Sequence, residues 1–259
     1  MPITGERAVV LGASMAGLLA ARVLADSYET VTVVERDALP TGPTPRRGVP
    51  QGKLIHALLA RGAKVLDELM PGILDELVAD GAIRWDGDYA KLCFSVGGHR
   101  LVQSGRCPSD AMPFYFQSRP FLEWHVLRRM RDVPNITILE GHDVVSLSAT
   151  PDRRRVTGVD VVDRDSREVR MLSGDLVVDA TGRGSRTPLF LEQLGYDRPP
   201  VDEVVVQLAY ACQPVRIRPG AIAENFIAVM PEHGRPRAFA TVSYENDTAV
   251  FAVGAMAGH

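Results

Sequence analysis

The chain has 259 residues, enough for one large domain or two modest ones, and its 46% hydrophobic and 24% charged residues are ordinary for a soluble globular protein. A formal net charge of −3 gives no basic surface of the kind that nucleic acids require, so we expect no nucleic-acid partner. The three cysteines are scattered without metal-ligand spacing, which fits a reducing, cytoplasmic compartment and indicates no metal site.

The first elements along the chain are predicted to form a βαβ unit. Residues 7–11 and 30–34 are apolar runs typical of buried parallel strands, and residues 18–25 have the apolar spacing of a helix. The apolar stretch over residues 8–21 is shorter than the roughly 20 apolar residues that span a bilayer, and Glu6 precedes it instead of a basic segment. We therefore expect neither a signal peptide nor a membrane partner.

The middle of the chain combines an irregular loop with helices. Prolines, glycines and paired arginines predict the loop over residues 39–52. Apolar spacing predicts an amphipathic helix over residues 56–70 and a shorter helix that ends near Gly81. Short antiparallel strands are expected within residues 82–102, and Pro120 suits the first turn of the next helix.

The remaining elements indicate two kinds of sheet. Four strands are expected to form an antiparallel meander, at residues 136–139, 144–148, 156–162 and 168–172. A buried apolar strand is then expected over residues 176–179 and a helix over residues 186–194. Later β-rich runs indicate a second, sheet-rich domain, at residues 204–211, 226–230, 238–243 and 249–253.

A glycine-rich turn lies between the first strand and the first helix. Gly12 and Gly17 match the outer glycines of G-x-G-x-x-G, with Ser14 at the middle position. The helix N-terminus after such a turn offers N–H groups and a positive dipole end to a pyrophosphate, and the Ser14 hydroxyl can add a hydrogen bond. Glu35 ends the second strand 23 positions after Gly12, close to the spacing of a carboxylate that binds a ribose 2′-OH. The alternative is an ordinary α/β turn with a surface glutamate.

A simple NAD-binding half would continue with alternating helices and parallel strands, whereas this chain inserts the antiparallel meander before Asp179-Ala-Thr-Gly182. Five segments carry a resemblance to a known family: the turn GASMAGL, the strand ending VVERD, the loop RRGVPQG with His56, Ser118-Arg119-Pro120 at a helix start, and Asp179-Ala-Thr-Gly182 after the meander. In these segments the sequence resembles the group A flavoprotein monooxygenases, the para-hydroxybenzoate hydroxylase-like superfamily. The resemblance covers most of residues 5–200.

The resemblance implies an α/β fold: a Rossmann-like FAD-binding domain of the glutathione-reductase type with an antiparallel meander, and part of a β-rich substrate domain. It implies a discontinuous FAD-binding domain over residues 1–82 and 107–198, and a partial substrate domain over residues 83–106 and 199–259. The residues expected to bind FAD are Gly12, Ser14, Met15, Ala16, Gly17, Glu35, Arg36, Arg47, Gln51, Arg119, Asp179, Thr181 and Gly182. For two features of the loop the sequence leaves an alternative open. Arg46 and Arg47 either bind phosphate or belong to a solvated loop, and His56 either faces the flavin or is a helix cap or surface group.

The resemblance also implies the chemistry. A flavin C4a-hydroperoxide would transfer one oxygen atom to a small aromatic or unsaturated substrate, and NAD(P)H is the candidate electron donor. Because the flavin supplies the reactivity, no side chain is expected to act as nucleophile. The alternatives are a flavin-dependent dehydrogenase or double-bond reductase, a halogenase-like enzyme although its Trp-x-Trp motif is absent, and a non-catalytic nucleotide-binding fragment. The sequence does not indicate an oligomeric state.

Two departures from the superfamily pattern bear on the prediction. In the segment Asp179-Ala-Thr-Gly182, Thr181 stands where the corresponding motif of the hydroxylases usually has an aspartate. The superfamily also has a further FAD-binding motif, Gly-Asp followed by a proline and a glycine-rich turn, and this motif is missing here. Gly87-Asp88 and Gly174-Asp175 are the only Gly-Asp pairs in the sequence, and neither is followed by such residues. We therefore expect the chain to be a C-terminally truncated member of the superfamily.

Overall fold

The computed structural model describes residues 3–108 and 113–256. Two compact units share the chain, and each is assembled from two separate segments. Unit 1 comprises Met1–Gly42 and Glu123–Glu203, and unit 2 comprises Pro43–Leu122 and Val204–His259. The division into cofactor and substrate domains that the sequence predicts stays a prediction, because compactness assigns no ligand to either unit.

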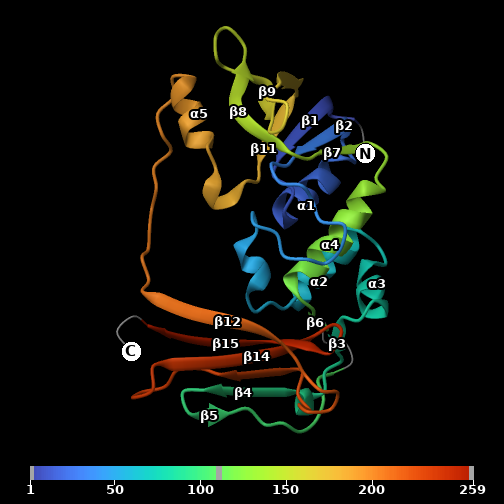
Figure 1. Ribbon diagram of the computed structural model, residues 1–259, viewed down its shortest axis with the longest axis vertical. Coiled ribbons are helices and arrows are strands. Elements are labelled where there is room, and N and C mark those ends of the chain that lie inside the picture. The colour runs from blue at the N-terminus through green and yellow to red at the C-terminus, as the bar shows by residue number, and fades with distance from the viewer. Residues whose placement is uncertain (1–2, 109–112, 257–259) are drawn as a thin grey trace. The chain divides into compact units, whose positions relative to one another are not determined.

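Unit 1 is built on a parallel sheet of four strands in the order β11-β1-β2-β7 (Figure 1). These strands are β1 (Gly5–Leu11), β2 (Tyr28–Val34), β7 (Ile136–Leu139) and β11 (Leu176–Asp179). Helix α1 (Met15–Leu24) connects β1 to β2 and packs against both strands. The predicted βαβ unit is therefore confirmed, and the carboxyl ends of β1, β2 and β11 meet at one edge of the sheet.

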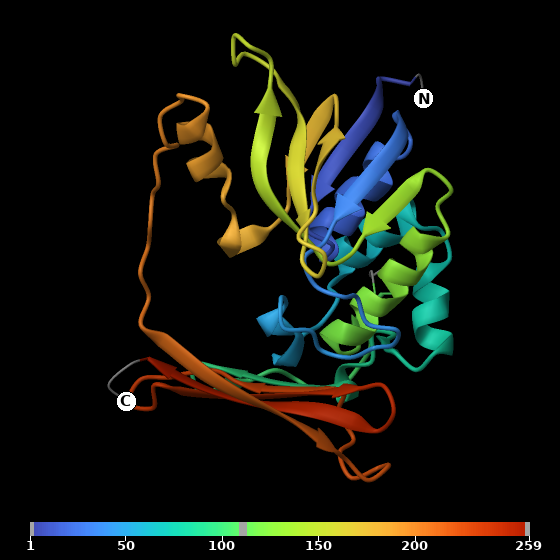
Figure 2. The same cartoon turned by 45° about the horizontal axis from the view of Figure 1, so that its top comes forward.

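A three-stranded antiparallel meander follows in unit 1, formed by β8 (His142–Ala149), β9 (Val156–Asp163) and β10 (Val169–Ser173). Val159 and Val161 of β9 are fully buried and pack on Val9, Leu11 and Val34 of the parallel sheet. Burial of each valine side chain stabilises the unit by about 1.5–3 kcal/mol. Figure 2 shows these strands rising beside the blue β1 and β2.

The structure corrects two predictions about unit 1. The strand over residues 136–139 does not belong to the meander, because β7 pairs in parallel with β2 and the chain leaves that sheet at Gly141, which has φ +71°. The strand over residues 176–179 exists, but it is not buried as expected. Leu176 is 37% exposed because β11 forms the edge of the sheet. Helix α5 (Thr187–Gln193) follows it, as predicted.

Unit 2 is built on a six-stranded sheet in the order β12-β15-β14-β13-β4-β5. These strands are β4 (Leu92–Val96), β5 (His99–Arg100), β12 (Leu208–Arg216), β13 (Phe226–Val229), β14 (Arg237–Tyr244) and β15 (Thr248–Met256). A second sheet pairs β3 (Ile83–Trp85) with β6 (Phe114–Phe116). Trp85, Phe116, Val242, Tyr244 and Val250 form one buried hydrophobic cluster of the unit. This is the sheet-rich region that the sequence predicts.

The remaining elements of unit 2 are helical. They are the 3-10 turns η1 (Pro50–Lys53) and η2 (Tyr89–Lys91) and the helices α2 (Ala60–Leu69) and α3 (Ile73–Ala79). Helix α4 (Arg119–Arg131) begins in unit 2 and continues into unit 1.

Two boundaries in unit 2 differ from the sequence prediction. Helix α2 begins at Ala60 rather than at His56, because the backbone N–H and C=O of Leu58 are bound to Tyr115 at 2.9 and 3.0 Å. The short antiparallel strands expected within residues 82–102 are present, since β4 pairs with β5 and β3 pairs with β6 in antiparallel register, and β4 also pairs in parallel with β13. The strand predicted at residues 204–211 begins only at Leu208, and the valines before it are exposed and outside any strand.

Candidate nucleotide-binding site

The turn between β1 and α1 requires glycine at two positions. Gly12 has φ +97°, and a Cβ atom there would lie 3.0 Å from the carbonyl oxygen of Ala180. A Cβ atom on Gly17 would lie 1.8 Å from the carbonyl oxygen of Gly12, a distance that no side chain can occupy. The N–H of Gly12 donates to the carbonyl oxygen of Val34 at 2.7 Å, which ties the turn to β2. The turn therefore has the close backbone packing that the motif predicts.

Helix α1 begins at Met15, three residues earlier than predicted, so its N-terminus lies at the turn itself. The Ser14 side chain does not cap the helix, and its hydroxyl donates instead to Oε1 of Glu123 on α4 at 2.9 Å. The sequence suggests a phosphate as the partner of this hydroxyl, whereas here it binds a carboxylate. The backbone N–H groups of Met15 and Ala16 in the first turn remain the groups suited to an anion.

The carboxylate of Glu35 lies beside the same turn. The residue is 7% exposed, and its Oε2 accepts a hydrogen bond from the N–H of Ala13 at 2.8 Å. Its Oε1 accepts a hydrogen bond from the N–H of Asp37 at 3.0 Å. An ionised carboxylate has about four acceptor positions and can therefore accept hydrogen bonds from several donors at once. Glu35 is thus held next to the turn, and its contact with a ribose stays a prediction.

The segment after β11, which begins at Ala180, packs against the glycine turn at Gly12. Ala180 N–H donates to the carbonyl oxygen of Leu11 at 2.9 Å. The Asp179 carboxylate accepts hydrogen bonds from the Thr181 N–H at 2.8 Å and from the Ser185 hydroxyl at 2.6 Å, and the Thr187 hydroxyl also donates to it.

Partial burial raises the pKa of Asp179, but the hydrogen bonds from Ser185, Thr181 and Thr187 outweigh this effect and hold its pKa below the ordinary value of 3.8. Thr181 also donates its hydroxyl to Asp179 and so helps to hold this carboxylate in place.

Ten of the thirteen predicted site residues lie in unit 1. They are Gly12, Ser14, Met15, Ala16, Gly17, Glu35, Arg36, Asp179, Thr181 and Gly182, all at or just after the carboxyl ends of β1, β2 and β11. The other three belong to unit 2: Arg47 is exposed in the loop, Gln51 is exposed in η1, and Arg119 is half-buried at the start of α4. For these three a cofactor contact stays a prediction.

His56 has a defined structural environment in unit 2. Its backbone N–H donates to the Tyr244 hydroxyl at 2.6 Å, and that hydroxyl donates to the His56 carbonyl oxygen at 2.9 Å. Burial raises the pKa of Tyr244, so this hydroxyl keeps its proton as donor. His56 lies four residues before α2 and therefore neither opens nor caps that helix.

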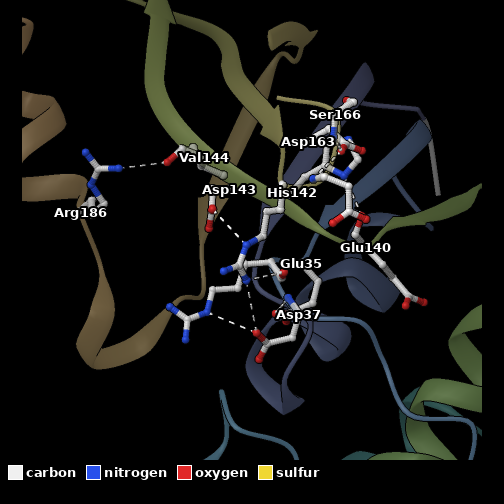
Figure 3. Close-up of polar contacts among 12 residues, drawn as sticks. Glu35, Asp37, Glu140, His142, Asp143, Val144, Asp163, Ser166 and Arg186 are labelled. Atoms are coloured by element: carbon white, nitrogen blue, oxygen red, sulfur yellow. Dashed lines mark hydrogen bonds and ion pairs between the residues drawn. The ribbon is translucent and has the colours of Figure 1, made fainter. Parts of the chain in front are cut away.

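Sequence reasoning missed a polar cluster beside Glu35. Arg164, in the turn between β9 and β10, donates from a terminal guanidinium nitrogen to the carbonyl oxygen of Arg36 at 3.1 Å. Its Nε lies 3.4 Å from Oδ2 of Asp143, and the same terminal nitrogen lies 3.9 Å from Oδ1 of Asp37. Figure 3 shows Asp37 and Asp143 near Glu35. In the sequence, Arg164 is only one of several charged residues in a turn, and nothing there indicates its partners.

Two observations concern other kinds of site. Within the described part of the chain, no group of three or more His, Cys, Asp or Glu side chains is arranged to hold a metal ion. No helix in the described ranges combines the length and apolar character that crossing a membrane requires.

Comparison with curated proteins gives a relative of similar sequence. The chain is 39% identical over 250 residues to the protein Rv3254 of Mycobacterium tuberculosis, and the match covers 95% of the chain and 52% of that protein. The chain therefore spans about half the length of this relative. No protein-family model matches the sequence.

Comparison with solved structures gives neighbours of the same fold. PqsL of Pseudomonas aeruginosa, described as a probable FAD-dependent monooxygenase, has a TM-score of 0.72 and 16% identity, with 98% of this chain and 61% of PqsL covered. The p-nitrophenol 4-monooxygenase PnpA of Pseudomonas putida has a TM-score of 0.70 and 17% identity, over 100% of this chain and 59% of PnpA. The myxobacterial FAD-dependent halogenase CndH has a TM-score of 0.66 and 19% identity, over 97% of this chain and 52% of CndH. The predicted fold class is confirmed: the chain has the fold of these flavoproteins.

Proposed function

We propose that this chain is the nucleotide-holding part of an FAD-dependent oxidoreductase, and that the reaction is the monooxygenation of a small aromatic or unsaturated molecule. One arrangement carries the proposal. The glycine turn at Gly12 lies between the buried carboxylate of Glu35 and the backbone of Ala180. The first helical turn of α1 follows it directly in the chain. The fold shared with PqsL and PnpA, and the names of those proteins, support the choice of FAD and of oxygen transfer.

The residues of unit 1 fit the adenosine diphosphate end of FAD. A pyrophosphate needs N–H donors and close backbone approach, which the first turn of α1 and the side-chain-free Gly12 provide. A ribose diol needs an acceptor, which Glu35 provides. Asp179 and Thr181 bind each other through hydrogen bonds, so in this proposal they fix the segment that covers the turn.

FAD, when bound, supplies the redox chemistry of its ring, and the protein supplies binding, orientation and protection from water. We therefore assign no nucleophile or acid–base residue in this chain. A small-molecule substrate is supported by the solved complex of PqsL with 2-aminobenzoylacetate. NADH or NADPH is the proposed electron donor.

Calorimetry tests the nucleotide proposal. The purified chain is titrated with ADP, FAD and, as a control for the base, GDP. We expect ADP and FAD to bind in one-to-one stoichiometry and GDP to bind at least tenfold more weakly. If neither ADP nor FAD binds, the assignment of a nucleotide site fails.

The reaction class has its own test. Protein reconstituted with FAD is incubated with NADH or NADPH, a panel of phenols and aryl amines, and ¹⁸O-labelled oxygen, and the products are analysed by mass spectrometry. Incorporation of one labelled atom supports monooxygenation. Loss or gain of two hydrogens without label would assign the enzyme as a dehydrogenase or reductase. With chloride and bromide added to the mixture, a halogenated product would assign it as a halogenase. Either result overturns the monooxygenase proposal.

A further inference from the structure

The orientation of the Glu35 carboxylate depends on the peptide group that follows it. Oε1 of Glu35 accepts a hydrogen bond from the N–H of Asp37 at 3.0 Å. This N–H belongs to the peptide group whose carbonyl is that of Arg36. Because a trans peptide is planar, its N–H and C=O point in opposite directions. Whatever holds the carbonyl of Arg36 therefore also sets the direction of the N–H toward Glu35.

Arg164 holds that carbonyl. A terminal nitrogen of its guanidinium donates to the Arg36 carbonyl oxygen at 3.1 Å. The arrangement runs from the Arg164 cation through one peptide group to the Glu35 anion. Hydrogen bonds in such a chain polarise one another, so the positive charge at the carbonyl end strengthens the N–H as a donor to Glu35.

The turn that carries Arg164 is fixed in place. The Arg164 N–H donates to the carbonyl oxygen of Gly141 at 2.9 Å. The Asp163 carboxylate accepts hydrogen bonds from the N–H groups of Asp165 and Ser166 at 2.9 and 2.8 Å, and these bonds lower the pKa of Asp163. Figure 3 labels Asp163 and Ser166 in this turn. Arg164 is therefore presented to β2 by a structured turn of the meander.

The ion pair between Arg164 and Asp143 explains the position of the Arg164 side chain less well than the hydrogen bond to the Arg36 carbonyl does. The side chains of Arg164 and Asp143 are 48% and 41% exposed, and their closest atoms are 3.4 Å apart. Exposed ion pairs of this kind contribute little to stability. The shortest side-chain contact of Arg164 is the hydrogen bond to a backbone carbonyl, which is the contact that bears on Glu35.

We propose that Arg164 is a positioning residue for ribose recognition: it orients the Glu35 carboxylate through the Arg36–Asp37 peptide. The inference rests on the proposed function, in which Glu35 binds the ribose 2′-OH. The meander then has a role in cofactor selection as well as in the core, because it brings Arg164 to the end of β2.

The test compares ADP with 2′-deoxy-ADP by calorimetry. The unaltered protein should bind ADP on the order of tenfold more tightly, the effect of one hydrogen bond to a charged group. In Arg164→Ala the ADP affinity should fall about five- to tenfold while the 2′-deoxy-ADP affinity changes less than twofold, so the preference disappears. Arg164→Lys, which keeps charge and donor, should retain part of the preference. Arg170→Ala removes an exposed arginine from β10 of the same meander and should retain all of it.

The outcomes separate the inference from the function on which it rests. If the unaltered protein binds neither nucleotide, the proposed function fails and the inference fails with it. If the protein prefers ADP and Arg164→Ala keeps the full preference, or weakens both nucleotides equally, only the role of Arg164 is overturned. Thermal melting of each variant shows whether it is folded, and Arg164→Met, whose side chain also lacks an N–H donor, replaces Arg164→Ala if the latter does not fold.

Discussion

The carbonyl oxygen of Ala180 lies 3.0 Å from the position that a Cβ atom on Gly12 would occupy. We therefore expect Gly12→Val to abolish ADP and FAD binding. A valine at this positive φ would cost about 1–3 kcal/mol of backbone strain, and its side chain would also clash with the segment after β11 that contains Ala180. The sequence predicts that Arg119 adds one phosphate contact among several, so Arg119→Ala should only weaken binding. Gly42→Ala is the matched control, because a Cβ atom at Gly42 meets nothing within 4 Å. Flavin fluorescence titration ranks the variants, and tighter binding by Gly12→Val than by Arg119→Ala would contradict the placement of the pyrophosphate.

Glu35 should contribute to affinity through the ribose. Loss of a hydrogen bond to a charged group costs about 1.5–3 kcal/mol, so Glu35→Ala should weaken ADP binding by roughly 10- to 150-fold. Glu35→Gln retains one oxygen acceptor and should lose less. Glu29→Gln, at an exposed position near the start of β2, removes the same charge and should leave affinity unchanged. Calorimetry at constant ionic strength measures all three, and unchanged affinity in Glu35→Ala would remove this residue from the site.

Ser14 should act on stability more than on nucleotide binding. Its hydroxyl binds Oε1 of Glu123, so Ser14→Ala should lower the free energy of unfolding by about 1 kcal/mol. Ser14→Gly restores the glycine of the motif and should retain ADP affinity within about a factor of two, because backbone N–H groups are the proposed phosphate donors. Urea unfolding and ADP titration check the two expectations. A tenfold loss of affinity in both variants would show that the hydroxyl itself contacts the phosphate.

Asp179 should make stability depend on acid pH. Its folded-state pKa lies below the ordinary value, so the folded state binds fewer protons than the unfolded state. The stabilisation is therefore complete above about pH 4 and is lost as the pH falls through the folded-state pKa. The group is partly exposed, which limits the contribution to about 1 kcal/mol or less. Asp179→Asn should be less stable than the unaltered protein at pH 7, with the difference shrinking toward pH 3 in urea titrations, whereas Asp197→Asn, at an exposed position, should show no such trend.

The meander should depend on its contact with the parallel sheet. Val161 is fully buried in the cluster that joins β9 to β1 and β2. Val161→Ala removes two methyl-sized groups from that cluster and should lower the free energy of unfolding by roughly 1.5–3 kcal/mol. Val169→Ala on β10, where the side chain is 63% exposed, should change stability by less than about 0.5 kcal/mol. Equal effects of the two substitutions would mean that the meander is not packed as described.

The parts of the site that depend on local sequence could be predicted. The turn at Gly12, the helix after it and the acid at the end of β2 all lie within 31 consecutive residues, from Gly5 to Glu35, and their spacing follows from strand and helix geometry. The Asp179–Gly182 segment was also recognisable, but only by its resemblance to a known motif. Its position above Gly12 depends on the pairing of β11 with β1, which no local pattern encodes.

The parts that depend on distant pairing could not be predicted. The apolar run over residues 136–139 fits a meander strand and a parallel strand equally well, and only its pairing with β2 decides between them. Arg164 binds a carbonyl oxygen 128 positions away, and a backbone carbonyl has no sequence signature. Leu58 fits the apolar spacing of a helix, yet its backbone groups bind Tyr115 instead.

The pairing of β1 with β11 also has a consequence for the order in which the site forms during synthesis. Gly12 and Glu35 leave the ribosome early, whereas Ala180, which covers the turn, follows 168 positions after Gly12. At about 5–20 residues per second this delay is on the order of 10–30 seconds. A nascent chain that already has its first βαβ unit therefore lacks the cover of its turn until β11 has been translated. In the proposed function, cofactor binding is then a late event in the folding of this protein, after the meander has been made.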